Sequence, residues 1–313
     1  MIQGKKILVT GGSGFLGSHI CNLLQDNNTL VVPRSAHYDL REREAVQQLF
    51  VDHSNINIVI HAAADIGGIG YSSTHPAQQF YNNALMNIHV LHESYMNHVE
   101  KFVGIGSVCE YPAKTATPFQ EKDVWDGYPV VTNDAYGITK RQLLAQSIAY
   151  RKEHNFRCIH LLPVNLYGPR DNFDKNNSHV IPALIQKTVT AKENHETVVD
   201  VWGTGNESRE FIYVDDAARA IILATEFYDE IYPVNVGSGK EMKICDLAQT
   251  IKRIIGFEGE FRYTNNGLGG QYRRVLDVSK AKELFGFSAT TSFEDGLRKT
   301  IQYYYDNRDK LGV

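Results

Sequence analysis

Four side chains that could move or hold protons lie close together in the sequence: Ser107 and Cys109 in "GIGSVCEYPAK", and Tyr136 and Lys140 in "YGITK". The i, i+4 spacing of Tyr136 and Lys140 puts a phenol and an ammonium on one face of a helix. A nearby cation favours the phenolate, so we expect a lowered pKa for Tyr136 and a role in proton transfer. The same spacing also arises on an amphipathic helix that packs a ring and extends a lysine to solvent.

A glycine-rich stretch, "TGGSGFLGSHICNLL", follows the first apolar run, "KKILVT". Gly11, Gly14 and Gly17 form a GxxGxxG pattern between a predicted strand and a predicted helix. Glycines there permit a tight turn and the close approach of a pyrophosphate, and the helix N-terminus offers free N–H groups. This position favours dinucleotide binding over a plain turn. We expect cofactor contacts from the three glycines and from Phe15 and Leu16.

The end of the second apolar run distinguishes the two nicotinamide dinucleotides. "NTLVVP" is followed by Arg34, and no carboxylate comes before Asp39. An acid here would bind the free ribose 2′-OH of NAD, whereas an arginine pairs with the 2′-phosphate of NADP. We therefore expect NADP(H), although a solvated surface arginine would give the same sequence. Asp39 and Leu40 are expected beside the adenine, and a helix N-cap would explain Asp39 equally well.

The elements that position these residues follow from an alternation of apolar runs and amphipathic stretches in the first half of the chain. The runs are "KKILVT", "NTLVVP", "INIVIHAA", "EKFVGIGS" and "FRCIHLLPVN". Runs that are apolar on both faces and separated by helix-length segments predict a parallel sheet covered by helices on both sides. This is a doubly wound α/β (Rossmann) fold. Ser107 would lie at the carboxyl end of its strand, the edge where such sheets bind ligands.

The second half is more mixed. It has helical patterns in "SHVIPALIQKTVTAKE", "VDDAARAIILATEF", "KICDLAQTIKRIIGF" and "SFEDGLRKTIQYYYDNRDK", and "YPVNVG" is predicted to be a strand that returns to the first sheet. We expect an NADP-binding Rossmann domain over residues 1–166 plus about 211–238. A smaller C-terminal α/β substrate lobe is expected over residues 167–210 plus 239–313.

The composition narrows the setting. With 313 residues, 42% hydrophobic and 22% charged, the chain can bury a large core. The formal net charge of -4, with both signs mixed, argues against a nucleic-acid partner. The N-terminus lacks the apolar core of a signal peptide and no run is long enough to cross a bilayer, so we expect a cytoplasmic protein without a membrane partner. The four cysteines are scattered without a CxxC pair, which predicts free thiols and no metal site.

Longer motifs occur along nearly the whole chain: "GGIGYSSTHPAQQFYNN" from Gly67, "GSVCEYP" from Gly106, "NDAYGITK" from Asn133, "NLYGPRDNFDKNNSHVIPAL" from Asn165, and "VWGTG" with "REFIYVDD" from Val201. These motifs resemble the extended short-chain dehydrogenase/reductase superfamily and, within it, the GDP-L-fucose synthase family. The resemblance implies a Rossmann fold, NADPH, a small-molecule nucleotide-sugar substrate and a homodimer. The dimer would form through the helix that bears Tyr136 and the helix that contains "NNALMNIHVLHESYM".

The resemblance also implies a bifunctional reaction. GDP-4-keto-6-deoxy-D-mannose would be epimerised at C3 and C5 and then reduced at C4, giving GDP-L-fucose. In that family a Cys and a His, which match Cys109 and His179, are the acid and base of the epimerisation. Tyr136 would donate the proton during reduction, and Ser107 would steady the oxygen while Lys140 also holds the nicotinamide ribose. Taken alone, a free Cys is commonly a small buried apolar residue and a His after Asn and Ser often caps a helix.

The resemblance assigns further contacts. Cofactor contacts would also come from Ala63, Ala64, Pro163, Asn165, Leu166 and His179. Substrate contacts would come from Ser107, Val108, Cys109, Asn165, Lys187, Trp202 and Arg209.

Several positions depart from that family's pattern. Val108 and Glu110 stand where the family usually has a serine and an apolar residue. Lys187 stands where an arginine is usual, which keeps the charge but loses the bidentate fork. The stretch "TNNGLGGQYRRVLDVS" also differs from the family. These changes lie on the substrate side, so another GDP-4-keto-6-deoxy hexose or heptose is open as the substrate.

Three other functions are compatible with the motifs. One is a C4 reductase without epimerase activity. Another is a sugar-nucleotide 4-epimerase or 4,6-dehydratase with tightly held NAD, although dehydratases carry an acidic pair where Val108 and Cys109 stand. The third is a non-catalytic nucleotide-sensing protein, against which the intact Ser107, Tyr136 and Lys140 count.

Overall fold

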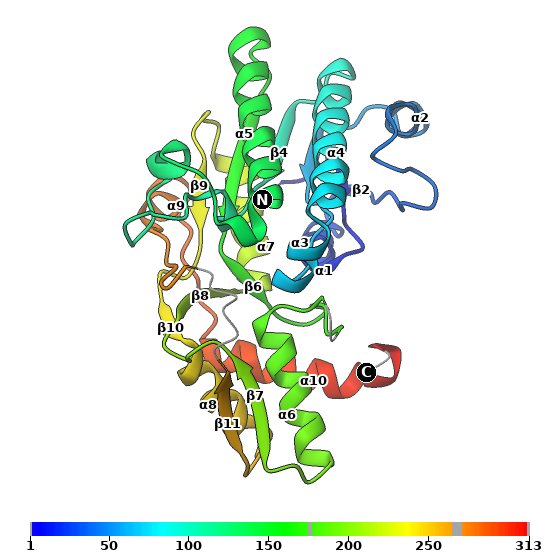
Figure 1. Ribbon diagram of the computed structural model, residues 1–313. Helices are drawn as coiled ribbons and strands as arrows, with labels where there is room; N and C mark the ends of the chain where they lie inside the picture. The colour runs from blue at the N-terminus through cyan, green and yellow to red at the C-terminus, as the bar shows by residue number, and fades with distance from the viewer. Residues whose placement is uncertain (1, 175–176, 265–270, 312–313) are drawn as a thin grey trace.

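The computed structural model describes residues 2–174, 177–264 and 271–311. Its upper half in Figure 1 is built on a six-stranded sheet in the order β2-β1-β3-β4-β5-β9, in which every neighbouring pair is parallel. The strands are β1 (Lys6–Thr10), β2 (Thr29–Val31), β3 (Ile58–His61), β4 (Lys101–Ile105), β5 (Cys158–Pro163) and β9 (Val234–Val236). The predicted doubly wound α/β fold is confirmed, and "YPVNVG" does return to the first sheet as β9.

Alternate residues of the strands enter different cores, which explains why the runs are apolar throughout. Ile7 and Val9 of β1 pack in one core with α1 (Phe15–Leu24) and α7 (Val214–Phe227). Leu8 packs in the other core with α2 (Arg43–Asp52), α4 (Pro76–Met96) and α5 (Asp134–His154). Burying one such branched side chain contributes roughly 1.5–3 kcal/mol. Figure 1 shows α4 and α5 side by side in front of the sheet.

The order of the strands creates a crevice. From β1 the chain goes to β2 on one side and then to β3 on the other, so the loops after β1 and β3 diverge at the carboxyl edge of the sheet. A switch point of this kind is where open α/β sheets bind their ligands. The loop after β4 continues as a 3₁₀ helix, η1 (Val108–Glu110), at the same edge.

The lower half contains two small sheets. One has the order β10-β8-β6, from β6 (Asn165–Tyr167), β8 (Ser208–Tyr213) and β10 (Glu241–Lys243), and the other pairs β7 (Val198–Trp202) with β11 (Glu260–Thr264). The helices α6 (Val180–Glu193), α8 (Ile244–Ile255) and α10 (Phe293–Leu311) pack with them in a separate core. The predicted helical patterns of the second half are thus present as α6, α7, α8 and α10.

The division into two domains stays a prediction. The strand β8 lies at the junction, since Ile212 packs in a core of the main sheet while Phe211 and Tyr213 pack in the lower core. The short helix α9 (Ser279–Phe285) contacts α7 and β9 beside the main sheet.

The remaining helices are α3 (Ile69–Thr74) and the 3₁₀ helices η2 (Glu121–Trp125) and η3 (Val131–Asn133). Residues 175–176 of the long motif after β6, and residues 265–270 of the divergent "TNNGLGGQYRRVLDVS" stretch, lie outside the described residues. Within the described ranges, no helix is both long and apolar enough to span a bilayer.

Candidate active site

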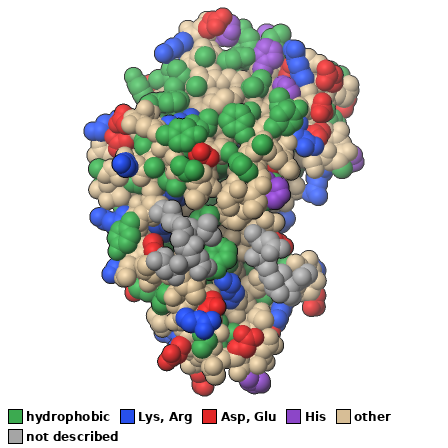
Figure 2. Space-filling view, viewed as in Figure 1, with side chains coloured by type: hydrophobic (Ala, Val, Ile, Leu, Met, Phe, Trp, Pro, Cys, Tyr) green, Lys and Arg blue, Asp and Glu red, His purple; other side chains and the backbone are tan. Residues whose placement is uncertain are grey.

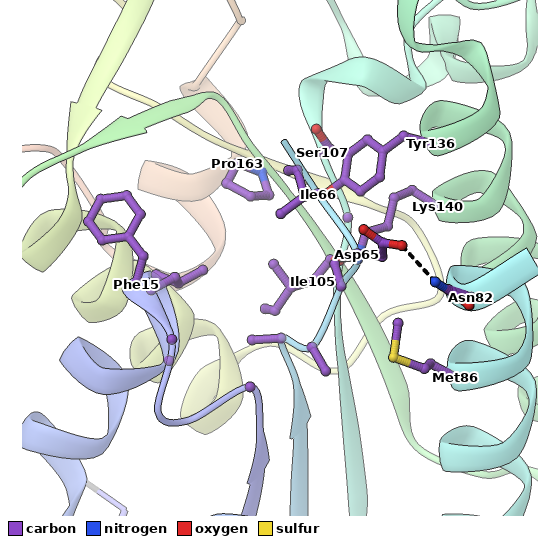
Figure 3. Close-up of a pocket in the computed structure, with 18 of the residues that line it drawn as sticks. Phe15, Asp65, Ile66, Asn82, Met86, Ile105, Ser107, Tyr136, Lys140 and Pro163 are labelled. Atoms are coloured by element: carbon purple, nitrogen blue, oxygen red, sulfur yellow. Dashed lines mark hydrogen bonds between the residues drawn. The ribbon is translucent and has the colours of Figure 1, made fainter. Parts of the chain in front are cut away.

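A cavity of about 590 Å³ opens at the carboxyl edge of the main sheet. It extends from the glycine-rich loop after β1, past the ends of β3 and β4, to α5 and the start of α6. All five predicted catalytic residues line it: Ser107, Cys109, Tyr136, Lys140 and His179. Figure 3 shows Tyr136 and Lys140 extending from α5 toward Ser107, with Phe15 and Pro163 on the opposite side. The fold therefore brings these residues together, while their roles stay predictions.

The glycine-rich loop has the close packing that the GxxGxxG pattern predicts. Gly11 has φ +68°, and a Cβ there would come within 2.8 Å of the Ala63 backbone nitrogen. A Cβ on Gly17 would lie 2.1 Å from the Gly11 carbonyl oxygen. The loop leads into α1, whose first turn has no acidic side chain, so its free N–H groups suit an anion. These features fit a dinucleotide pyrophosphate. The other predicted cofactor contacts that line the cavity are Gly14, Phe15, Leu16, Asp39, Leu40, Ala63, Ala64, Pro163, Asn165 and Leu166.

At the end of the cavity where the adenine is predicted to bind, the carboxylate of Asp39 is already paired. Arg41 donates from Nε to Oδ1 of Asp39 at 2.9 Å and from Nη1 to Oδ1 of Asn82 at 3.3 Å. The hydrogen bond from Arg41 lowers the pKa of Asp39 from its ordinary value. Arg34 is exposed and lies outside the cavity. It lines an adjoining hollow, and Pro33 and Tyr38 line both this hollow and the cavity. Two arginines thus flank this end, and Asp39 is engaged by one of them.

Ser107, Tyr136 and Lys140 form the inner wall. Tyr136 and Lys140 are 6% and 2% exposed, and the Lys140 Nζ lies 5.6 Å from the centroid of the Tyr136 ring. The ammonium donates to the Ile105 carbonyl oxygen at 2.8 Å, which ties α5 to the end of β4. Ser107 is the N-cap of η1, and its hydroxyl accepts the Cys109 backbone N–H at 3.1 Å. The set is rigidly held from both sides.

The expected lowering of the Tyr136 pKa by Lys140 is wrong for this structure. Burial raises the pKa of Tyr136 above its ordinary value, with smaller contributions in the same direction from Cys109 and Glu110, while Ser107 acts in the opposite direction. Burial also lowers the pKa of Lys140 to about 8, and the Glu110 charge partly offsets this. Desolvation dominates because both groups lie deep between α5 and β4. The phenol is therefore fully protonated at neutral pH, as a proton donor must be.

Cys109 is surrounded by donors. The Asn133 side-chain amide donates to the Cys109 sulfur at 2.9 Å, and Nη1 of Arg274 lies 3.9 Å from the same atom. Arg209 couples electrostatically to both Arg274 and Cys109. Burial, with the Arg274 charge second, lowers the pKa of Arg209 to about 10. The thiol of Cys109 thus faces the cationic groups of the lower half of the molecule.

His179 is the N-cap residue of α6 and lines the cavity. Its side chain keeps solvent contact, but the surrounding protein removes enough water to lower the pKa of His179 from its ordinary value. A lowered pKa favours the neutral imidazole, the form that can accept a proton.

Three predicted substrate contacts lie outside this cavity. Trp202 is 57% exposed, and the Lys187 Nζ lies 5.3 Å from the centroid of its ring. Lys187 also donates to the Asp200 carbonyl oxygen at 3.2 Å. Arg209 donates from Nη1 to the Ser208 carbonyl oxygen at 2.7 Å. Val108 and Asn165, in contrast, line the cavity. Within the described residues, no group of three His, Cys, Asp or Glu side chains could hold a metal ion.

Comparison with known proteins decides the family. Residues 7–237 match the model of the NAD dependent epimerase/dehydratase family. The chain is also 36% identical to the putative GDP-L-fucose synthase 2 of Arabidopsis thaliana, over 97% of this chain and 93% of that protein. The chain belongs to the NAD dependent epimerase/dehydratase family. Its predicted enzyme class and its predicted resemblance to GDP-L-fucose synthases are confirmed.

Two solved structures are similar to this chain over nearly its whole length. A GDP-6-OMe-4-keto-L-xylo-heptose reductase from C. jejuni superimposes with a TM-score of 0.91 at 26% identity, covering 98% of this chain and 99% of that one. A GDP-L-fucose synthetase from Naegleria fowleri bound to NADP superimposes with a TM-score of 0.89 at 29% identity, covering 99% and 96%. The second of these agrees with the predicted NADP(H) cofactor.

Sequence reasoning missed several members of this epimerase/dehydratase site. Arg41 lines the cavity itself and pairs with Asp39, while Asn133 and Arg274 contact the site through the sulfur of Cys109. Asp65 lines the cavity too, and its carboxylate accepts from the Asn82 side-chain amide at 2.7 Å, as Figure 3 shows. The signal for Asn133 was present, since it lies three residues before Tyr136 within "NDAYGITK". The signal for Arg274 was the basic pair in "QYRRVLD".

Proposed function

We propose that the protein is an NADPH-dependent 3,5-epimerase and 4-reductase of GDP-4-keto-6-deoxy-D-mannose, and that its product is GDP-L-fucose. The observation that carries the proposal is the meeting of two functional sets in one cavity. Ser107, Tyr136 and Lys140 form a reduction set next to the glycine-rich loop, and Cys109 and His179 supply two further proton-transfer groups.

In the reductive step, NADPH bound along the glycine-rich loop supplies the hydride for C4. Tyr136 donates the proton that the developing alkoxide needs, and its burial keeps the phenol protonated until then. The Ser107 hydroxyl donates a hydrogen bond to the same oxygen, and η1 holds that hydroxyl in place. Lys140, anchored on the Ile105 carbonyl, keeps α5 and the Tyr136 ring in register with β4.

In the epimerisation, the C4 carbonyl acidifies the hydrogens on C3 and C5. Each inversion is the removal of a proton from one face and its return to the other face. Cys109 receives N–H donors from Asn133 and Arg274, an arrangement that stabilises negative charge on sulfur. The lowered pKa of His179 favours its neutral form, which can take up a proton. The two groups lie on different elements, η1 and α6, as a two-faced proton transfer requires.

The GDP part of the substrate would extend from Cys109 into the lower half of the molecule. Arg209 supplies a guanidinium on β8 near Arg274, which suits a diphosphate. Lys187 on α6 and the exposed ring of Trp202 on β7 are the further contacts that we propose.

The decisive test is incubation of the wild-type protein with GDP-4-keto-6-deoxy-D-mannose and NADPH in D₂O, followed by NMR of the product. We expect NADPH oxidation and a GDP-L-fucose product that carries deuterium at C3 and C5. Absence of NADPH oxidation would refute the proposed function.

A C4 reductase without epimerase activity is the second candidate. Val108 gives it support, because it removes a hydroxyl from the substrate side of η1, and so does the similarity to the C. jejuni 4-keto-heptose reductase. The same NMR experiment separates the two candidates. A pure reductase would give a 6-deoxy product with unchanged C3 and C5 configuration and without deuterium at those carbons.

We also propose a homodimer formed through α4 and α5. The helix α4 exposes Phe80, Tyr81 and Ile88. Figure 2 shows hydrophobic side chains gathered on the upper part of the face where Figure 1 places α4 and α5. Sedimentation velocity should give a dimer for the wild type and a monomer for a Tyr81→Glu variant. The two-domain division and a cytoplasmic location are further parts of the proposal.

A further inference from the structure

A buried acid and imidazole lie directly behind the catalytic edge. Glu110, the last residue of η1, is 0% exposed, and His160 of β5 is 1% exposed. The His160 Nε2 lies 3.0 Å from Oε1 and 3.2 Å from Oε2 of Glu110.

The pair is built into the loop that carries Ser107 and Cys109. The Glu110 carboxylate accepts the Ser107 backbone N–H at 2.9 Å, while the Ser107 hydroxyl accepts from Cys109, so the two ends of η1 are closed by a capping box. On the other side, the Glu110 carbonyl accepts from Nε of Arg141 at 2.6 Å. A shift of Glu110 would therefore move both the hydroxyl of Ser107 and the sulfur of Cys109.

Glycines at the end of β4 leave space for the pair. A Cβ on Gly106 would lie 2.2 Å from Oε1 of Glu110 and 2.3 Å from Nε2 of His160. Gly104 is the register partner of His160, and a Cβ there would lie 3.2 Å from the His160 Nδ1. The glycines of "VGIGS" thus make the space that the two polar side chains fill.

The Glu110 carboxylate is also coupled to the reduction set. It opposes the burial that lowers the pKa of Lys140 to about 8, and it adds to the burial that raises the pKa of Tyr136. Burial, with Lys140 second, lowers the pKa of His61 on β3 to about 3, so that histidine is neutral. Other titratable and charged groups face Glu110 or Lys140 from the elements packed around them. They are Tyr136 and Arg141 from α5, His61 from β3, Cys109 from η1, and Tyr111, which follows η1, in addition to His160 from β5.

We propose that Glu110 and His160 are positioning residues of the reduction, which hold η1 in place and supply the negative charge that keeps Lys140 protonated in its buried position. The Lys140 ammonium donates to the Ile105 carbonyl oxygen at the end of β4, and the Glu110 carboxylate accepts the N–H of Ser107, two residues further along the same loop. Among the described residues, Glu110 is the carboxylate whose charge acts on Lys140. His160 holds the carboxylate in the geometry that serves both Ser107 and Lys140. The inference rests on the proposed NADPH-dependent reduction.

The test is Glu110→Gln, which keeps the shape and removes the charge. Without the carboxylate, Lys140 loses its proton at a lower pH, so the alkaline limb of the pH profile of the reduction kcat should move down by on the order of one pH unit. The pH dependence of NADPH affinity, measured by fluorescence titration without substrate, should move in the same direction. Glu121→Gln is the matched control, because Glu121 is also buried and accepts a backbone N–H from Asn235. It should leave both profiles unchanged.

A double variant separates the charge from packing. Glu110→Met with His160→Leu replaces both polar partners by apolar side chains of similar size, which commonly restores stability. We expect its Tm to be close to the wild-type value while the alkaline limb stays shifted. A limb at the wild-type position in both Glu110 variants would overturn the inference. If the wild type fails to oxidise NADPH with the 4-keto sugar, the proposed function is refuted, and the NADPH-binding profiles still decide the inference.

Discussion

The side-chain amide of Asn133 donates a hydrogen bond to the sulfur of Cys109 at 2.9 Å. The contact joins η3 to η1 across 24 residues of sequence and orients the thiol within the cavity. Arg274 approaches the same sulfur from the lower half of the molecule. Two N–H donors that point at one sulfur would favour negative charge there, which the proposed role of Cys109 in epimerisation needs.

Asn133→Ala should therefore slow epimerisation. A hydrogen bond to a charged group contributes about 1.5–3 kcal/mol, so we expect a loss of roughly 10- to 100-fold in deuterium incorporation at C3 and C5. NADPH affinity should not change. Val131→Ala, at a neighbouring position that is 76% exposed, is the control and should behave as the wild type. Wild-type exchange in Asn133→Ala would mean that the amide only packs against the thiol.

Cys109→Ser should uncouple the two halves of the reaction. A thiol ionises near pH 8.5, whereas an aliphatic hydroxyl hardly ionises, so proton abstraction should slow far more than hydride transfer. NMR should detect an unepimerised or partly epimerised 6-deoxy product with little deuterium at C3 or C5. His179→Asn should give the same pattern at its own carbon. A fully inverted product at the wild-type rate would leave the thiol without a catalytic role.

Tyr136→Phe removes the hydroxyl that we propose as the proton donor of the reduction. We expect turnover to fall roughly 100- to 10,000-fold, the usual range for general acid catalysis. NADPH should still bind, because the ring and its packing are kept. Stopped-flow measurement of NADPH oxidation, together with a fluorescence titration of NADPH, separates the two effects. Turnover near the wild-type value would exclude Tyr136 as the acid.

Arg34→Ala tests the choice of cofactor. Loss of a phosphate partner should raise the KM for NADPH roughly 10-fold and leave the KM for NADH nearly unchanged. Arg41→Ala should act differently, because it releases the Asp39 carboxylate, which could then accept from a free 2′-OH and improve the use of NADH. Equal losses with both cofactors in Arg34→Ala would show that this arginine does not contact the 2′-phosphate.

Asp171 should make stability depend on pH. Burial raises the pKa of Asp171 to about 7, and its Oδ2 atom has no hydrogen-bond partner among the described residues. Between about pH 4 and pH 7 the folded state then holds more protons than the unfolded state, so stability falls as pH rises through this window. Asp171→Asn keeps the acceptor for the Asn172 N–H and cannot ionise.

The variant should therefore be more stable than the wild type at pH 8, by at most about 4 kcal/mol, and by less at pH 5. Differential scanning fluorimetry at both pH values measures the difference. An equal change in Tm at both pH values would show that the carboxyl does not titrate in this range.

The sequence alone was sufficient to predict the layout of the sheet and the meeting of Ser107, Tyr136 and Lys140 in one cavity. Alternate residues of β1, β3 and β4 pack in two different cores. Burial on both faces makes each strand apolar throughout, so the strands can be recognised from local sequence. Gly11 and Gly17 were also predictable, because only glycine allows the backbone contacts found there. The residues proposed as catalytic were named from short motifs, and the position of Ser107 at the edge of the sheet was enough to predict that it shares one cavity with Tyr136 and Lys140.

Only the tertiary structure decided how these groups are tuned. The i, i+4 spacing of Tyr136 and Lys140 suggested a lowered phenol pKa, but the depth at which α5 packs on β4 makes desolvation the larger effect. Spacing along one helix cannot report that depth, because it depends on how the whole sheet is covered. The partners of Cys109 were hidden for a related reason. Arg274 lies 165 residues away in the chain, and such contacts form only when distant segments fold onto one site.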